Sequence, residues 1–193
     1  MNVAGAASAV LFARASLQFF LQTHRLIGGL FLVEQGWFVV AFLVRRPERA
    51  VSRRPGSWLL AFGGTFGGVL FRPGGVYPQW GVEAGFGLQL VGLTICIISL
   101  LALGRSFGMV AADRGVQTRG PYAIVRHPIY ASYLLIQSGY LLQSVSGWNL
   151  LVLVLASGCN IGRALAEERL LARSPGYRAY QSQIRWRLIP GLW

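Results

Sequence analysis

The residues best suited to chemistry lie in two short segments that border long apolar runs. The first is Arg119-Gly-Pro-Tyr-Ala-Ile-Val-Arg-His-Pro-Ile-Tyr130, which combines an imidazole, two phenols and two prolines. The second is Arg163-Ala-Leu-Ala-Glu-Glu168, at the far end of the apolar hairpin that follows. Titratable groups at a membrane boundary are costly, so their presence indicates a small-molecule site.

The His-Pro step predicts the start of a helix that can attract an anion. Pro128 suits the first helical position, where its missing N–H would have no partner in any case. His127 then occupies the cap, and a helix start of this kind attracts a carboxylate or a phosphate. Tyr130 follows in the first turn and Tyr122 precedes it after a Gly-Pro turn. A surface cap with interfacial aromatic residues is the simpler interpretation of His-Pro alone.

Arg163 and Glu167 are four residues apart and therefore share one helix face. A surface salt bridge is the simpler interpretation, although Arg before Glu is the less favourable order for such a pair. A carboxylate here can hold a ligand ammonium, and a guanidinium can orient an anionic substrate. Glu168 lies about 100° further around the helix, so we expect it to face solvent or the membrane interface.

The composition indicates an all-α integral membrane protein. Of the 193 residues, 54% are hydrophobic and only 12% are charged, whereas about 25% is usual in soluble domains. All eighteen basic residues are Arg, and the net charge is +12. Because the Arg residues border the apolar blocks, they fit an anionic lipid surface better than a nucleic acid, which is not an expected partner.

The apolar blocks predict a bundle of about five transmembrane helices in a single domain. The blocks cover residues 26–44, about 58–71, about 82–103, 128–143 and about 148–164. The second is short for a span of about 20 residues, and its glycines at 63, 64, 67 and 68 permit close helix approach. The last two, joined by a tight turn at 144–147, form a helical hairpin. Residues 1–103 are the predicted membrane scaffold and residues 104–193 the cofactor-binding catalytic half.

The distribution of Arg predicts the orientation in the membrane. Residues 45–57, 104–126 and the tail from Glu167 are rich in Arg, whereas 72–81 and 144–147 are poor. Cytoplasmic loops carry the basic excess, so both chemical segments should face the cytoplasm of a multi-pass membrane protein. The composition, rich in Gly, Ala and Arg, suggests a bacterial inner membrane. The sequence does not decide whether residues 3–22 form an interfacial helix or a further spanning helix.

Four motifs occur in an order that resembles one enzyme family. Gly104-Arg-Ser-Phe107, Gly120-Pro-Tyr122, Arg126-His-Pro-x-Tyr130 and Glu167-Glu168 surround the helical hairpin. Each motif is short, but the ordered set resembles the isoprenylcysteine carboxyl methyltransferases, which belong with the phospholipid methyltransferase-like membrane enzymes. The resemblance covers residues 100–190. It implies S-adenosylmethionine as the methyl donor, bound at the cytoplasmic ends of the last helices, and a lipophilic acceptor that enters from the bilayer.

The resemblance also assigns roles to individual residues. It implies that Glu167 holds the methionine portion of the cofactor and that Arg163 is the catalytic residue that orients the acceptor. The implied cofactor-binding set is Arg114, Gly115, Val116, Gln117, Tyr122, His127, Pro128, Ile129, Tyr130 and Glu167. The chain departs from the family twice: Ser174-Pro-Gly-Tyr177 is shorter than the usual stretch after the acidic pair, and Gln117 occupies the region where His is common.

The residue types that the sequence lacks favour a reaction that depends mainly on aligning the reacting molecules. The sequence has no Cys/His cluster, no second His near His127 and no catalytic carboxylate pair, so we expect neither a metal nor a covalent mechanism. Cys96 and Cys159 lie in apolar blocks and should be buried without a disulfide. Two rival functions are a membrane sterol- or enone-type reductase that uses NADPH and a non-catalytic lipid-binding protein. The sequence does not decide whether the methyl acceptor is a carboxylate, an amine or a thiol.

Overall fold

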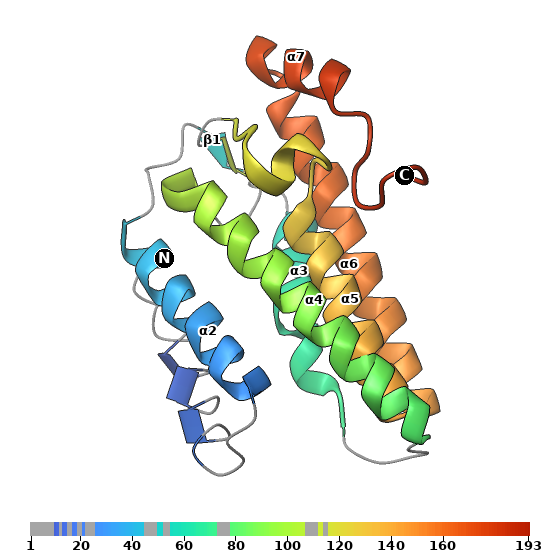
Figure 1. Ribbon diagram of the computed structural model, residues 1–193. Helices are drawn as coiled ribbons and strands as arrows, with labels where there is room; N and C mark the ends of the chain where they lie inside the picture. Colours follow the sequence, from blue (N-terminus) through green and yellow to red (C-terminus); the bar gives the residue numbers. More distant parts are fainter. Residues whose placement is uncertain are drawn as a thin grey trace.

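A computed structural model describes residues 10–11, 13–14, 17–18, 21, 26–44, 50–51, 55–72, 78–106, 112–113 and 116–193. Within these ranges the fold is a bundle of helices capped at one end by a short surface helix, so the predicted all-α class is confirmed (Figure 1). The α-helices are α2 (Leu26–Val44), α3 (Pro55–Phe66), α4 (Gln79–Leu103), α5 (Pro128–Gln143), α6 (Gly147–Leu171) and α7 (Pro175–Gln183). The 3-10 helices are η1 (Gly67–Leu70), η2 (Gly104–Ser106) and η3 (Gly120–Ala123).

Most helix bounds follow the predicted apolar blocks, but α6 is longer. Its apolar block ends at Ala164, whereas the helix continues to Leu171. The added residues are Ala, Leu, Glu and Arg, which are strong helix formers, and Pro175 then starts α7. As a result Glu167 lies inside a rigid helix.

Two of the described helices are long and apolar enough to cross a membrane. These are α4 and α6, with 25 residues each. Their outward-facing side chains include Val91, Ile98, Val154 and Leu155, which are about half exposed or more and fit contact with lipid tails. The helices α3 and α5 have 12 and 16 residues, fewer than the roughly 20 that a full span needs. The count of about five spans therefore stays a prediction.

A two-residue ladder brings distant segments to one end of the bundle. Strand β1 (Ala50–Val51) pairs antiparallel with β2 (Ala112–Asp113). The ladder lies at the end where α5 begins and α6 terminates (Figure 1). The segments after α2, α4 and α6, which the Arg distribution assigns to one membrane face, thus share one end. That this end faces the cytoplasm stays a prediction.

Glycines allow the backbones of α4 and α5 to touch. A side chain at Gly85 would collide with the carbonyl oxygen of Gly139, and one at Gly139 would lie 2.5 Å from the carbonyl oxygen of Gly85. A side chain at Gly81 would similarly lie 2.5 Å from the carbonyl oxygen of Leu142. Small residues four apart serve this purpose in membrane helices. The contact fixes α5, and with it the start of α5, against the long helix α4.

The predicted glycine contact of α3 is largely confirmed. Side chains added at Gly63, Gly64 and Gly67 would collide with Cys159, Asn160 and Ala156 of α6, respectively. A side chain at Gly68 would meet nothing within 4 Å. Gly63 and Gly64 therefore seat α3 against α6, and Gly67 seats the following helix η1 against it. Cys96 and Cys159 are both free thiols; Cys96 is buried as expected, whereas Cys159 is only half-buried.

The opposite end of the hairpin is fixed by a buried amide. Asn149 is 0% exposed and its Nδ2 donates to the carbonyl oxygens of Arg72 and Ser144 at 3.0 and 2.8 Å. Its Oδ1 accepts the Arg72 N–H at 3.1 Å. Ser146 caps α6 by accepting the Asn149 N–H at 3.1 Å. These bonds set the register of the α5–α6 hairpin, and the register decides which residues meet at its other end.

The glycine contact predicts opposite effects for two Gly-to-Ala variants of α4. Gly85→Ala is expected to destabilise the protein by about 1–3 kcal/mol, because the methyl group overpacks the helix contact. A methyl group added at Gly87 would meet nothing within 4 Å, so Gly87→Ala should stabilise the protein by up to about 1 kcal/mol through helix propensity. Thermal unfolding in detergent, followed by tryptophan fluorescence, measures both. Equal melting temperatures for the two variants would contradict the close contact.

Candidate functional site

The start of α5 has the predicted cap geometry and is tied to the C-terminal tail. His127 is the N-cap residue and Pro128 occupies the first helical position, fully buried. The His127 N–H donates to the carbonyl oxygen of Arg187 at 2.9 Å, and the Arg126 N–H donates to that of Trp186 at 2.9 Å. The Ile129 amide donates to no loop or tail carbonyl among the described residues. It is therefore the first-turn amide that remains available for an anion.

The end of α6 meets this helix start, as the sequence predicts. His127 Nδ1 lies 3.8 Å from Glu167 Oε2. The Tyr130 hydroxyl donates to Glu167 Oε1 at 2.5 Å. The His127 and Tyr130 rings stack, with centroids 5.6 Å apart and planes 16° apart. The imidazole, the phenol and the carboxylate thus form one cluster that joins α5 to α6.

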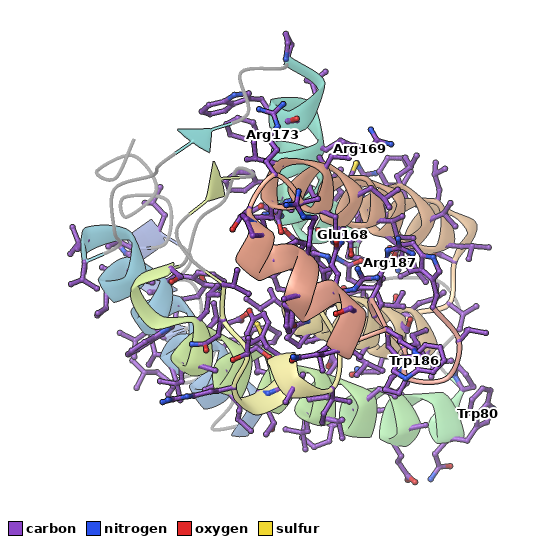
Figure 2. The ribbon with its side chains drawn as sticks, turned by 90° about the horizontal axis from the view of Figure 1, so that it is seen from above. Trp80, Glu168, Arg169, Arg173, Trp186 and Arg187 are labelled. Atoms are coloured by element: carbon purple, nitrogen blue, oxygen red, sulfur yellow. The ribbon has the colours of Figure 1, made fainter. Side chains whose placement is uncertain are left out.

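The expected exposure of Glu168 is wrong, because this carboxylate is the centre of a buried ion-pair network. Glu168 is 6% exposed. Its Oε1 lies 3.1 Å from Arg126 NH1 and 3.2 Å from His127 Nε2, and its Oε2 accepts from Arg187 Nε at 3.0 Å. Figure 2 shows Glu168 beside Arg187, whereas Arg169 projects from the opposite side of α6. The tail folds back over this end of α6, so Glu168 faces protein.

The two adjacent carboxylates therefore differ in what they can still bind. Both oxygens of Glu168 are engaged by cationic or imidazole groups. The Glu167 side chain is 20% exposed and one of its oxygens accepts the Tyr130 hydroxyl. A carboxylate offers about four acceptor positions, so Glu167 keeps capacity for a ligand cation. Glu168 is instead a structural anchor for His127.

Arg163 lies one turn before Glu167 on the same face of α6. Its guanidinium carbon is 4.9 Å from the centroid of the Tyr130 ring. Its NH1 donates to Thr65 Oγ1 of α3 at 3.1 Å. Arg163 is 7% exposed. A buried guanidinium that stacks on an aromatic face is held in one orientation, so Arg163 can present its N–H groups to a substrate in a fixed direction.

Helix α7 closes the site with two tyrosines that are not among the predicted site residues. Tyr177 and Tyr180 are 3% and 4% exposed, and the Tyr180 hydroxyl donates to the Tyr122 carbonyl at 2.7 Å. Burial raises the pKa of Tyr180 to about 12 and raises the pKa of Tyr122 well above its usual value. Both phenols therefore stay neutral at physiological pH. Their i, i+3 spacing in α7 is the only sequence signal for this packing.

The remaining predicted cofactor residues lie around η3 or outside the described residues. Tyr122 is buried at 8% exposed, and Ile129 packs between the two apolar clusters of the bundle. The Gln117 side chain donates to the Ala102 carbonyl and accepts the Thr118 N–H at 3.0 Å, so it holds the loop. Val116 is half-buried. Arg114 and Gly115 lie outside the described residues, and the cofactor roles of the set stay predictions.

The fold and the site together define a helical membrane protein with a buried charged cluster at one end of its bundle. A family model described as phospholipid methyltransferase matches residues 80–177, which cover α4 from its second residue, all of α5 and α6, and the first turn of α7. The chain therefore belongs to the phospholipid methyltransferase family, and it is a membrane methyltransferase. The recognition from sequence is confirmed at this level. No curated protein matches the chain significantly.

Proposed function

We propose that the protein transfers a methyl group from S-adenosylmethionine to a lipophilic acceptor, such as an isoprenylcysteine-like carboxylate. The observation that carries this proposal is the meeting of Glu167 with the His127–Pro128 helix start, beside Tyr130, in a chain of this family. The location that fits is a bacterial inner membrane crossed several times by the chain, with the site facing the cytoplasm.

The donor set fits the cofactor's charges. S-adenosylmethionine ends in an ammonium and a carboxylate, and when bound it supplies an electrophilic methyl on a sulfonium. Glu167 has carboxylate capacity for the ammonium, and the Ile129 amide at the positive end of α5 suits the carboxylate. The stacked rings of His127 and Tyr130 are buried beside the Glu167 carboxylate and hold it in place. The residues present therefore match the zwitterionic end of the cofactor.

The residues of the chain contribute alignment and charge. Methyl transfer of this kind is an in-line displacement that needs the acceptor's lone pair directed at the methyl. Arg163, one turn from Glu167, holds the acceptor's anionic group at a fixed point. Burial of the site excludes water from the reacting atoms. Alignment alone can contribute about 7–11 kcal/mol to lowering a barrier.

Cofactor choice is tested by thermal shift of the purified protein in detergent. A ligand at 100 times its Kd should stabilise the native state by about 2.7 kcal/mol. We expect S-adenosylmethionine to raise the melting temperature and NADPH to leave it unchanged. Transfer of labelled methyl into a membrane lipid extract, followed by mass spectrometry, then identifies the acceptor. A shift with NADPH alone would indicate a reductase, and no shift with either compound would indicate a non-catalytic lipid-binding protein.

Replacement of Arg163 should impair turnover more than cofactor binding. Arg163→Lys keeps the charge but loses the planar group over Tyr130 and the bond to Thr65. We expect kcat for methyl transfer to fall at least about tenfold, because alignment is lost, while the Kd for S-adenosylmethionine stays within about threefold. Titration calorimetry and the labelled-methyl assay measure the two quantities. A large loss of cofactor affinity with unchanged kcat would assign Arg163 to the cofactor instead.

A further inference from the structure

A buried amide oxygen in the contact between α3 and α6 has no role in the site described so far. Asn160 is 3% exposed, and its Oδ1 has no hydrogen-bond partner among the residues that the structure describes. A buried acceptor without a donor costs about 1–3 kcal/mol. Such a group in a membrane helix points to a ligand that supplies the missing donor.

Asn160 belongs to the same face of α6 as the proposed donor site. Asn160, Arg163 and Glu167 follow at intervals of three and four residues, which aligns them on one side of the helix. The stretch from Glu167 to Asn160 spans about 10 Å along the axis. Arg163 lies between the other two along the helix, and helical side chains lean toward the helix N-terminus, so its side chain extends toward the level of Asn160.

Helix α3 supplies the other wall of this cluster. The Asn160 amide and the Arg163 Cδ both lie against Gly64, where a side chain would collide with the amide and lie 3.2 Å from Cδ. The next residue, Thr65, is exposed and accepts a hydrogen bond from Arg163 NH1 at 3.1 Å. The buried guanidinium thus reaches the outer surface of the bundle through a hydroxyl.

We propose that Thr65 and Asn160 form the acceptor side of the site, at the α3–α6 contact. An anionic oxygen of the acceptor replaces the neutral Thr65 hydroxyl on Arg163, because a charge-assisted hydrogen bond is stronger, and the released hydroxyl then donates a hydrogen bond to the same oxygen. Asn160 Oδ1 accepts a hydrogen bond from an N–H or O–H group next to that anion. The acceptor headgroup therefore combines a carboxylate or phosphate with a neighbouring donor. This inference rests on the proposed methyltransferase function and adds the recognition of the acceptor.

Four lipid probes test the predicted headgroup by direct binding to the full-length protein in maltoside detergent. N-Palmitoylglycine has a carboxylate beside an N–H, and O-palmitoylglycolate has an ester oxygen at that position. Dipalmitoylphosphatidylethanolamine and dipalmitoylphosphatidylcholine form the corresponding phosphate pair, because only the first has hydrogen-bond donors. We expect the donor-bearing member of at least one pair to bind about 3- to 10-fold more tightly, the effect of one hydrogen bond. The pair that responds identifies the source of the anion.

Variants assign the effect to the two residues. Asn160→Leu should abolish the preference for the donor-bearing probe, and Asn160→Asp, which keeps the size, should weaken both anionic probes at least about tenfold through charge repulsion. Thr65→Val should weaken both members of a pair about threefold, the low end of one lost hydrogen bond, and Thr65→Ser should restore binding. Thr94→Val is the matched control, because Thr94 Oγ1 donates to the Leu90 carbonyl of its own helix, at 2.8 Å.

The outcomes separate this inference from the proposed function. Retained binding of S-adenosylmethionine together with an unchanged probe preference in Asn160→Leu would overturn the inference alone. Absence of any preference in the unmodified protein, or of binding to all four probes, would overturn it as well. Failure of the unmodified protein to bind S-adenosylmethionine would instead overturn the proposed function.

Discussion

Replacement of Glu167 by Gln is expected to weaken S-adenosylmethionine binding by roughly 10- to 100-fold, the usual effect of losing a hydrogen bond to a charged group. Gln keeps the size of the side chain and an oxygen that can accept the Tyr130 hydroxyl, but it carries no charge for the ligand ammonium. Because Glu167 is partly exposed, folding should tolerate the change. Titration calorimetry in detergent measures the Kd, and the melting temperature without ligand should stay within about 2 °C.

Two further variants complete this test. Glu83→Gln removes an exposed carboxylate of α4, so it should leave the Kd unchanged. His127→Ala removes the ring that stacks on Tyr130 and contacts both acidic residues, and it should abolish measurable binding. Unchanged affinity in both Glu167→Gln and His127→Ala would show that the cofactor binds elsewhere.

The parts of the fold that follow from local patterns are predictable from the sequence. The bounds of α2 and α5 match the apolar blocks, because turn residues and proline interrupt the hydropathy there. The cap at His127 follows from the Pro at the next position. A hairpin with a three-residue connection, residues 144–146, then forces the start of α5 beside the end of α6. The meeting of His127 with Glu167 is a consequence of this geometry.

Contacts between segments that lie far apart in the sequence are not predictable in this way. Helix periodicity orients Glu168 away from the face of Glu167 but does not say what covers it. Arg187 follows 19 residues later and reaches Glu168 only because the tail folds back. The contact of Gly85 with Gly139 needs the register between α4 and α5, which neither helix specifies alone. The sequence pattern of a helix shows which residues share a face, but only the packed structure shows which faces contact each other.

The position of Glu168 also explains why adjacent acidic residues in one helix can have separate tasks. Its three partners come from the start of α5 and from the tail, so one carboxylate holds both segments against α6. His127 is fixed by this network on one side and is left to face Glu167 on the other. The carboxylate that we propose to bind the ligand therefore lies beside an imidazole whose orientation is already set, and this would lower the entropy cost of binding.

Removal of this anchor should affect stability more than any other single change at the site. Glu168→Gln leaves Arg126 and Arg187 without their counter-charge, and breaking one side of a buried ion pair costs about 3–5 kcal/mol. We expect a fall in melting temperature of more than about 5 °C. Arg169 occupies the exposed neighbouring position, so Arg169→Gln should shift the melting temperature by less than about 2 °C.

A double-variant cycle separates the ion pair from general damage to α6. If Glu168 and Arg187 act together, the double variant Glu168→Gln/Arg187→Gln should lose at least about 0.5 kcal/mol less than the sum of the single variants. Strictly additive losses would mean that the 3.0 Å contact contributes nothing to stability. S-adenosylmethionine should still bind to Glu168→Gln below its melting temperature, more weakly than to the unmodified protein but more tightly than to Glu167→Gln. The reverse order of affinities would mean that Glu168 binds the cofactor and that Glu167 is the structural anchor.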